Sequence, residues 1–158
     1  MTMSKEERDR AHNAGIEDLY IHTEAMPWLD FSPGFQFKVL RTSAETGTWA
    51  VMFKADAGTA FPRHNHLGAG EYLMISGKME VRGGVQEGGI TALPGDYGYE
   101  PNGIIHDRTE FPVESVFWFQ NHGAVNFTDD ENRTLMILDW QTIRQMEAAG
   151  TAKLAQAA

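Results

Sequence analysis

Three histidines in the middle of the chain have the types and spacing of metal ligands. His64 and His66 are two positions apart, so on an extended backbone both imidazoles project from the same face. His106 comes later, and in a rolled sheet its strand can lie beside the first pair. Neutral nitrogen ligands suit Fe, Zn, Cu or Ni better than Mg or Ca, and ligand type alone does not choose within the first group. The pattern indicates a reactive metal site with open coordination positions.

The alternative interpretation is that His64 and His66 lie on a solvated loop and that His106 is unrelated to them. A following carboxylate, Glu71, the flanking glycines and the downstream histidine favour the metal site in a chain rich in predicted strands. The other histidines lack this context and are expected to be surface or packing residues: His12, His22 and His122.

Composition narrows the chemistry further. The 158 residues fit one domain, and there is no cysteine, which excludes disulfides, thiolate zinc sites and a cysteine nucleophile. The balance of 13 basic and 22 acidic residues gives a net charge of -9, which repels phosphate backbones and anionic lipid. No stretch approaches the roughly 20 apolar residues that span a bilayer. We therefore expect a cytoplasmic protein with no nucleic-acid or membrane partner.

The elements that must position the histidines are short strands separated by glycine-rich turns. Alternation begins at Phe35, and the chain between the first strands and the tail lacks long crossover helices, which favours a β-sandwich or barrel. A helix is expected at 142–156, and the polar residues 4–14 could form a short one. The predicted domain has its core at about 35–140 and a polar N-terminal segment at 1–15. The expected strands cover residues 35–39, 48–54, 71–76, 79–82, 90–93, 113–120 and 135–140.

The frame of glycines and ligands resembles the two motifs of the cupin superfamily. It consists of Gly58, His64, His66, Glu71, Gly77 and His106. The resemblance implies an all-β fold, the double-stranded β-helix or jelly-roll barrel, with the metal inside.

A closer resemblance covers about residues 42–130. The runs Gly70-Glu-Tyr-Leu, Met79-Glu-Val-Arg-Gly-Gly, Tyr97-Gly-Tyr-Glu and Phe111-Pro-Val-Glu-Ser look like the diketone-cleaving (acetylacetone-cleaving) dioxygenases and the related 2,4'-dihydroxyacetophenone dioxygenases. That family implies Fe(II) held by three histidines, matching His64, His66 and His106, and an enzyme that uses O2 to cleave a carbon-carbon bond beside a carbonyl. The implied partners are a small carbonyl substrate and O2, and recombinant protein could carry Zn or Ni instead.

Glu71 and Tyr72 cannot both face the site, because neighbours on a strand point to opposite sides. Many cupins use a glutamate at this place as a fourth metal ligand. The resemblance to the diketone-cleaving family instead implies a site in which three histidines bind the metal and no carboxylate does. We expect Tyr72 to line the pocket and Glu71 to point elsewhere.

The resemblance also implies a polar shell around the metal, formed by Arg82, Glu100 and Thr109. Alternation offers another interpretation for Arg82, a solvated strand charge paired with Glu80 or Glu87, and Glu100 could be ordinary turn chemistry. The candidate pocket walls are Phe61, Phe117 and Phe119, although phenylalanines at strand spacing are commonly core residues.

One departure and two competing functions qualify the resemblance. Gln120-Asn121-His122 is more polar than expected, which leaves the substrate open. A non-catalytic zinc-binding sensor would need a partner-binding segment, which we do not expect here. An isomerase or decarboxylase using Mn or Zn would need Glu71 as a true fourth ligand. Exposed sheet edges in small cupins favour association, so a homo-oligomer is expected.

Overall fold

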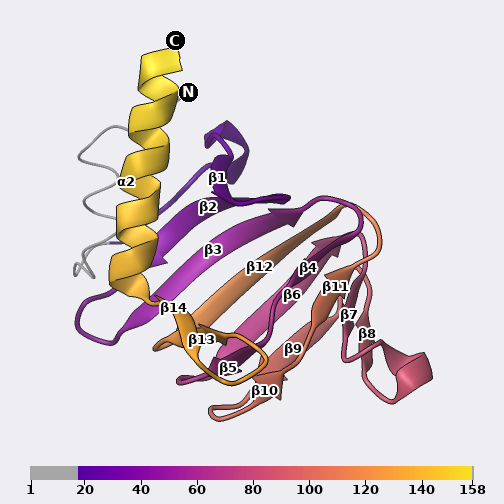
Figure 1. Ribbon diagram of the computed structural model, residues 1–158. Helices are drawn as coiled ribbons and strands as arrows, with labels where there is room; N and C mark the ends of the chain where they lie inside the picture. The colour runs from indigo at the N-terminus through magenta and orange to yellow at the C-terminus, as the bar shows by residue number, and fades with distance from the viewer. Residues whose placement is uncertain (1–17, 158) are drawn as a thin grey trace.

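The computed structural model describes residues 18–157 and shows short antiparallel strands followed by one long helix (Figure 1). None of the helices in this part of the chain is long and apolar enough to cross a bilayer. The elements in chain order are η1 Thr23–Ala25, β1 Leu29–Ser32, β2 Phe35–Thr42, β3 Thr48–Ala55, β4 Thr59–Phe61, β5 His64–His66, β6 Gly70–Ser76, β7 Met79–Val81, η2 Val85–Glu87, β8 Ile90–Ala92, β9 Tyr97–Glu100, β10 Ile105–His106, β11 Thr109–Phe111, β12 Ser115–His122, β13 Val125–Thr128, β14 Thr134–Leu138 and α2 Trp140–Ala157.

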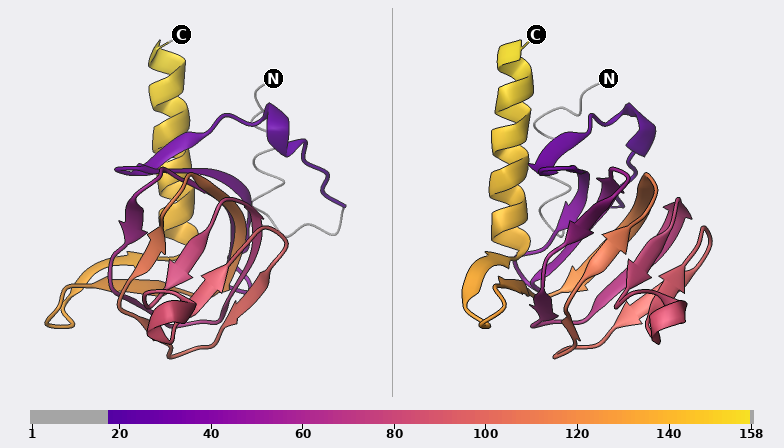
Figure 2. Two further views of the ribbon diagram at one scale, coloured as in Figure 1. Left: turned by 90° about the vertical axis from the view of Figure 1, so that its right-hand side faces the viewer. Right: turned by 45° about the vertical axis from the view of Figure 1, so that its right-hand side comes forward.

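Three sheets curl around a common interior. The largest has the strand order β1-β2-β3-β12-β6-β9, and the two smaller sheets have the orders β10-β5-β13-β14 and β4-β11-β7-β8. Every strand pairing in the described part of the chain is antiparallel. The end-on view in Figure 2 shows the strands closing into a barrel, with α2 standing to one side. Strands from both halves of the sequence therefore alternate around the same cavity.

Period-two alternation decides which side chains enter the barrel. On β12, Ser115, Phe117, Phe119 and Asn121 are buried, whereas the residues between them are partly exposed. β6 follows the same rule up to Met74, whereas β2 departs from it, because Lys38 is buried between Phe37 and Val39. The buried rings pack edge to face or stacked, for example Phe35 against Phe61 with centroids 4.2 Å apart. An aromatic core thus fills the interior.

Helix α2 lies against β1, β2 and β14, outside the barrel (Figures 1 and 2). Asp139 caps its first turn, because its Oδ1 accepts a hydrogen bond of 2.8 Å from the backbone N–H of Thr142. Ile143 is fully buried, and Gly150 lets the helix approach Leu29 closely. The helix covers one flank of the sheet and leaves the cavity to the strands.

The expected all-β architecture with a C-terminal helix is confirmed. Several details differ: β1 precedes the first expected strand, Tyr97–Glu100 forms a strand that alternation did not reveal, and Trp140 begins the helix instead of ending a strand. The short helix expected at residues 4–14 lies outside the described residues, as does His12. Tyr97–Glu100 alternates glycine with tyrosine, so its pairing with β6, not its own pattern, makes it a strand.

Gly77 is the motif glycine whose conformation the fold requires most strictly. It connects β6 to β7 with φ +83°, and a Cβ there would collide with Ser115 Oγ and the Glu114 carbonyl. Gly58, the other motif glycine, has a matching φ of +81° but open space around it. At both positions a side chain would have to adopt the unfavourable left-handed backbone conformation. Only at Gly77 would the side chain also clash with neighbouring atoms.

This pair makes a matched test of the turn. Gly58→Ala should lower the free energy of unfolding by about 1–2 kcal/mol, the cost of the left-handed conformation. Gly77→Ala should cost more by at least about 1 kcal/mol, because packed backbone and the Ser115 hydroxyl must move. Urea titration of both variants beside the unchanged protein measures the difference. Equal losses would show that β12 yields to the added methyl group without cost.

Candidate metal centre

The three histidines predicted as ligands converge inside the barrel. β5 carries His64 and His66 on one face, and β10 pairs with it so that His106 lies opposite His64. One ring nitrogen from each residue lies within 4.8 Å of the others, and all three side chains are buried. The ring centroids are 5.2 to 5.4 Å apart. The structure therefore brings together residues that are far apart in sequence.

Oxygen acceptors hold two of the imidazoles from behind. The Nδ1 of His64 lies 2.8 Å from the Pro62 carbonyl, and the Nδ1 of His66 lies 3.2 Å from the Asn121 side-chain oxygen. We assign the proton to Nδ1 in both rings, because each acceptor can only receive a hydrogen bond. This tautomer leaves the Nε2 lone pairs free to bind a metal.

Burial keeps the imidazoles uncharged. Desolvation lowers the pKa of His64 to about 4 and the pKa of His106 to about 3, and it also lowers the pKa of His66. Two buried atoms, His66 Nε2 and His106 Nδ1, have no hydrogen-bond partner among the described residues. Neutral ring nitrogens whose lone pairs converge on one point suit a transition metal as ligands. Burying such nitrogens without a metal or a hydrogen bond would cost stability.

Glu100 is the carboxylate that reaches the histidines. It ends β9, and its oxygens lie 3.2 Å from His66 Nε2 and 3.5 Å from His106 Nδ1. Burial raises the pKa of Glu100 to about 7. A carboxyl group with that pKa can both accept and release a proton near neutral pH.

Tyr72 and Glu71 occupy opposite faces of β6. Tyr72 is buried and lines the cavity, and burial raises the pKa of its hydroxyl to about 12. Glu71 lies on the outer face, where its carboxylate accepts a hydrogen bond of 2.6 Å from the Tyr97 hydroxyl and lies 3.3 Å from His122 Nε2. Glu71 therefore does not reach the three histidines.

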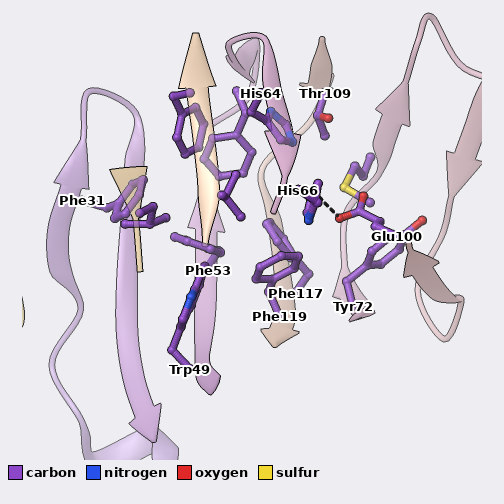
Figure 3. A pocket seen from close by; sticks show the side chains of 15 residues that line it. Phe31, Trp49, Phe53, His64, His66, Tyr72, Glu100, Thr109, Phe117 and Phe119 are labelled. Carbon is purple, nitrogen blue, oxygen red and sulfur yellow. Dashed lines mark ion pairs between the residues drawn. The ribbon is translucent and has the colours of Figure 1, made fainter. Parts of the chain in front are cut away.

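His64 and His66 line one side of a cavity of about 40 Å³, and His106 lies next to them, outside the set of lining residues. Figure 3 shows His64, His66, Glu100, Tyr72 and Thr109 together, opposite Phe31, Phe53 and Trp49. Thr109 is buried, and its hydroxyl has no hydrogen-bond partner among the described residues. The polar groups of the cavity are thus concentrated around the imidazoles, and the rest is apolar. The three phenylalanines proposed as walls line it: Phe61, Phe117 and Phe119.

Arg82 is the predicted site residue that does not line the cavity. It lies exposed just beyond β7 with φ +54°, so it does not continue the strand. No ion pair with Glu80 is found, since Glu80 pairs with Lys78 at 2.5 Å. Its charge still contributes to the lowered pKa of His106. Arg82 therefore lies outside the cavity wall.

Sequence reasoning missed several residues of the site. Asn121 was noted only as unexpectedly polar, although strand alternation from Phe117 and Phe119 places it inside the barrel. Gly98 was also missed: it faces Tyr72 across the β6–β9 pairing, and a Cβ there would collide with the Tyr72 ring. The remaining apolar lining residues come from other strands and gave no local signal: Phe31, Trp49, Phe53, Met79, Val125, Phe127 and Leu138.

The buried histidines predict how the stability of the metal-free protein depends on pH. Their pKa is lower in the folded chain than the ordinary 6.5, so below pH 6.5 the unfolded chain binds protons that the folded chain does not. The free energy of unfolding should fall by a few kcal/mol, as an order of magnitude, between about pH 6.5 and pH 4. Urea titrations in the presence of a chelator measure this fall.

Two variants check the origin of that fall. In a double variant with His64→Gln and His106→Gln, the free energy of unfolding should depend less steeply on pH. Glu100 has the opposite effect on stability, because burial raises its pKa to about 7. The folded chain therefore holds a proton on Glu100 that the unfolded chain releases, and this stabilisation is lost as pH rises through about 7. Glu100→Gln removes it and should make the fall in the free energy of unfolding toward low pH steeper. A double variant with an unchanged slope would contradict this account.

Comparisons with known proteins agree with this geometry. The acetylacetone-cleaving enzyme of Acinetobacter johnsonii is 45% identical to the chain over 107 residues, which cover 68% of this chain and 70% of that protein. The crystal structure of an acetylacetone dioxygenase from the same organism superposes with a TM-score of 0.78 at 37% identity, over 87% of this chain and 94% of that one. A candidate acetylacetone dioxygenase from Methylibium petroleiphilum PM1 gives a TM-score of 0.79 at 35% identity, over 84% and 95% of the two chains.

The expected cupin fold is confirmed by these structures, and the chain is homologous to the acetylacetone-cleaving enzyme. A family model for the ChrR cupin-like domain matches residues 16–126, which include all three histidines and all the strands up to β12. The chain therefore belongs to the ChrR cupin-like domain family.

Proposed function

We propose that this chain is a non-haem Fe(II) dioxygenase that cleaves a carbon-carbon bond next to a carbonyl group. The observation that carries the proposal is the cluster of three buried, neutral histidines beside an apolar cavity. The relatives named as acetylacetone-cleaving enzyme and acetylacetone dioxygenase support an oxygenase acting on a diketone.

His64, His66 and His106 would hold the metal through their ring nitrogens. Bound Fe(II) would supply a Lewis acid for the two oxygens of a diketone and a place where O2 can react. Because all three ligands are neutral, they leave the full positive charge of the ion to favour an anionic, doubly coordinating substrate. The ligand set therefore selects for an enolate over a neutral ketone.

Glu100 would move the proton that makes the substrate anionic. Its carboxylate accepts the proton from the carbon between the two carbonyl groups, which leaves the enolate and a neutral carboxyl group. The raised pKa of Glu100, about 7, suits this exchange at neutral pH. Its place against His66 and His106 keeps the carboxyl group next to the bound substrate.

Two hydroxyl groups would orient the enolate. Tyr72 stays protonated at neutral pH, because its pKa is raised to about 12, so it can donate a hydrogen bond to a substrate oxygen. Thr109 offers a buried hydroxyl that has no hydrogen-bond partner within residues 18–157. Around them, phenyl rings exclude water from the reacting carbon.

The size of the cavity favours a short aliphatic diketone over an aryl ketone. Its volume of about 40 Å³ corresponds to roughly three or four water molecules. The rings that close it are packed against each other, for example Phe53 against Phe117 with centroids 5.4 Å apart. A benzene ring would have to displace them, which close-packed cores resist. Acetylacetone is smaller and has no ring, so it would displace fewer of these side chains than 2,4'-dihydroxyacetophenone, and we propose it as the better substrate.

The competing functions fit less well. An isomerase or decarboxylase that needs Glu71 as a fourth ligand is disfavoured, since Glu71 lies on the outer face of β6. A non-catalytic zinc site would use the three histidines but would give no role to Glu100, Tyr72 and Thr109 around the cavity. We therefore retain the oxygenase.

Oxygen consumption tests this proposal directly. Protein loaded anaerobically with Fe(II) should consume O2 when acetylacetone is added, and much more slowly or not at all with 2,4'-dihydroxyacetophenone. His106→Ala should abolish uptake, because it removes a ligand, and Zn-loaded protein should be inactive, because zinc has no redox chemistry. Absence of uptake by iron-loaded protein with either substrate would refute the assigned substrate class.

The role of Glu100 has a matched control on the outer face. Glu100→Gln should retain iron but lower kcat by about 10²–10⁴-fold with acetylacetone, because proton transfer is lost. Glu71→Gln makes the same chemical change and should leave activity and iron content unchanged. The defect in Glu100→Gln should shrink at higher pH, where the substrate ionises in solution. Loss of iron in Glu100→Gln would instead identify Glu100 as a ligand, and loss in Glu71→Gln would support the four-ligand alternative.

A further inference from the structure

Asn121 is a fully buried amide in a row of apolar side chains. It follows Phe117 and Phe119 on the inward face of β12 and has no exposed surface. Across the pairings of β12, its neighbours are Trp49 on β3 and Gly70 on β6. A polar side chain in this setting must be compensated by hydrogen bonds.

Only half of this amide is used within the described part of the chain. The Asn121 Oδ1 lies 3.2 Å from His66 Nδ1, whereas its Nδ2 is buried with no hydrogen-bond partner among the described residues. A buried donor without a partner lowers stability, and an apolar residue of similar size would avoid that cost. The contact with His66 is therefore the feature that accounts for an asparagine here.

The orientation of the amide fixes the tautomer of His66. With Oδ1 toward the ring, Nδ1 carries the proton and Nε2 keeps its lone pair. With the amide reversed, Asn121 Nδ2 would face His66 Nδ1, and the ring proton would have to move to His66 Nε2. That nitrogen faces Glu100. His64 is held in the same tautomer by a backbone carbonyl, that of Pro62. At His66 a replaceable side chain supplies the acceptor at 3.2 Å, beside an interaction of the ring with the Gly68 backbone.

Gly70 maintains this contact by leaving room for it. A Cβ at Gly70 would lie 3.0 Å from His66 Cε1 and 3.1 Å from Asn121 Oδ1. Both distances are tighter than ordinary van der Waals contact, so a side chain there would push the imidazole and the amide apart. The register that pairs Asn121 with Gly70 thus serves the same contact.

We propose that Asn121 is a positioning residue that sets the tautomer and the metal affinity of His66. The inference rests on the proposed three-histidine metal site, but it does not depend on which reaction the site performs. Asn121 does not line the cavity, so it acts through the imidazole and not on a substrate.

The test compares Asn121→Leu with Gln120→Leu, which removes an amide from the outer face of the same strand. Zn²⁺ affinity, measured by competition with a chromophoric chelator, should fall about 10–100-fold in Asn121→Leu, as is usual when the partner of a metal-binding histidine is lost. Gln120→Leu should bind Zn²⁺ like the unchanged protein. Long-range proton–nitrogen NMR of the metal-free chain should show His66 protonated at Nδ1, and this preference should be lost in Asn121→Leu.

Asn121→Asp separates the acceptor from the packing, because it keeps an oxygen at the same place. It should retain the Nδ1 tautomer and close to full Zn²⁺ affinity, whereas Asn121→Leu should not, even if both variants melt at the same temperature. The Gly68 backbone also interacts with His66, so an unchanged tautomer and affinity in Asn121→Leu would show that it suffices and would overturn the proposal. His106→Ala is the independent control. If this variant binds Zn²⁺ as tightly as the unchanged protein, the proposed three-histidine metal site is wrong.

Discussion

The structure depends on the cost of burying three imidazole rings at one point. Desolvation opposes their protonation and lowers each pKa, so they remain neutral donors. Two of their nitrogens, His66 Nε2 and His106 Nδ1, have no hydrogen-bond partner among the described residues, which is unfavourable in an apolar interior unless a cation binds them. The same burial raises the pKa of Glu100 toward neutrality. A single physical condition, the burial of these groups in the interior of the barrel, thus keeps the candidate metal ligands neutral and brings the carboxyl group proposed for proton transfer into its working range.

Strand pleating then sorts polar groups between the interior and the outer surface. Tyr72 faces the cavity, and its neighbour Glu71 joins Tyr97 and His122 outside. On β12, Asn121 lies inside and contacts His66, whereas His122 lies outside and contacts Glu71. A shift of one residue in either strand would exchange these two sets and destroy the site. The uninterrupted pairing of β12 with β3 holds the register, and β12 pairs in constant register with β6 from Phe117 to Asn121.

Glycines make the close approaches that the site needs, for two different reasons. Gly77 is required because the turn has a positive φ and packs against Ser115. Gly70 and Gly98 lie in extended strands, where any residue could adopt the backbone, and they are needed because ring atoms of His66 and Tyr72 occupy the space of a side chain. Space and conformation are separate constraints, and this barrel uses both.

The sequence by itself determined the ligand types, the shared face of His64 and His66, the all-β class and the opposite orientations of Glu71 and Tyr72, because these follow from strand periodicity and local composition. It could not place the strand Tyr97–Glu100, which depends on its pairing with β6, or exclude Arg82 from the cavity wall, which depends on its positive φ. Only the tertiary structure showed that Asn121 holds His66, that Gly98 makes room for Tyr72, and that phenyl rings from several strands reduce the cavity to about 40 Å³. Those features arise from contacts between distant strands, and no local pattern in the chain encodes which distant side chains will meet.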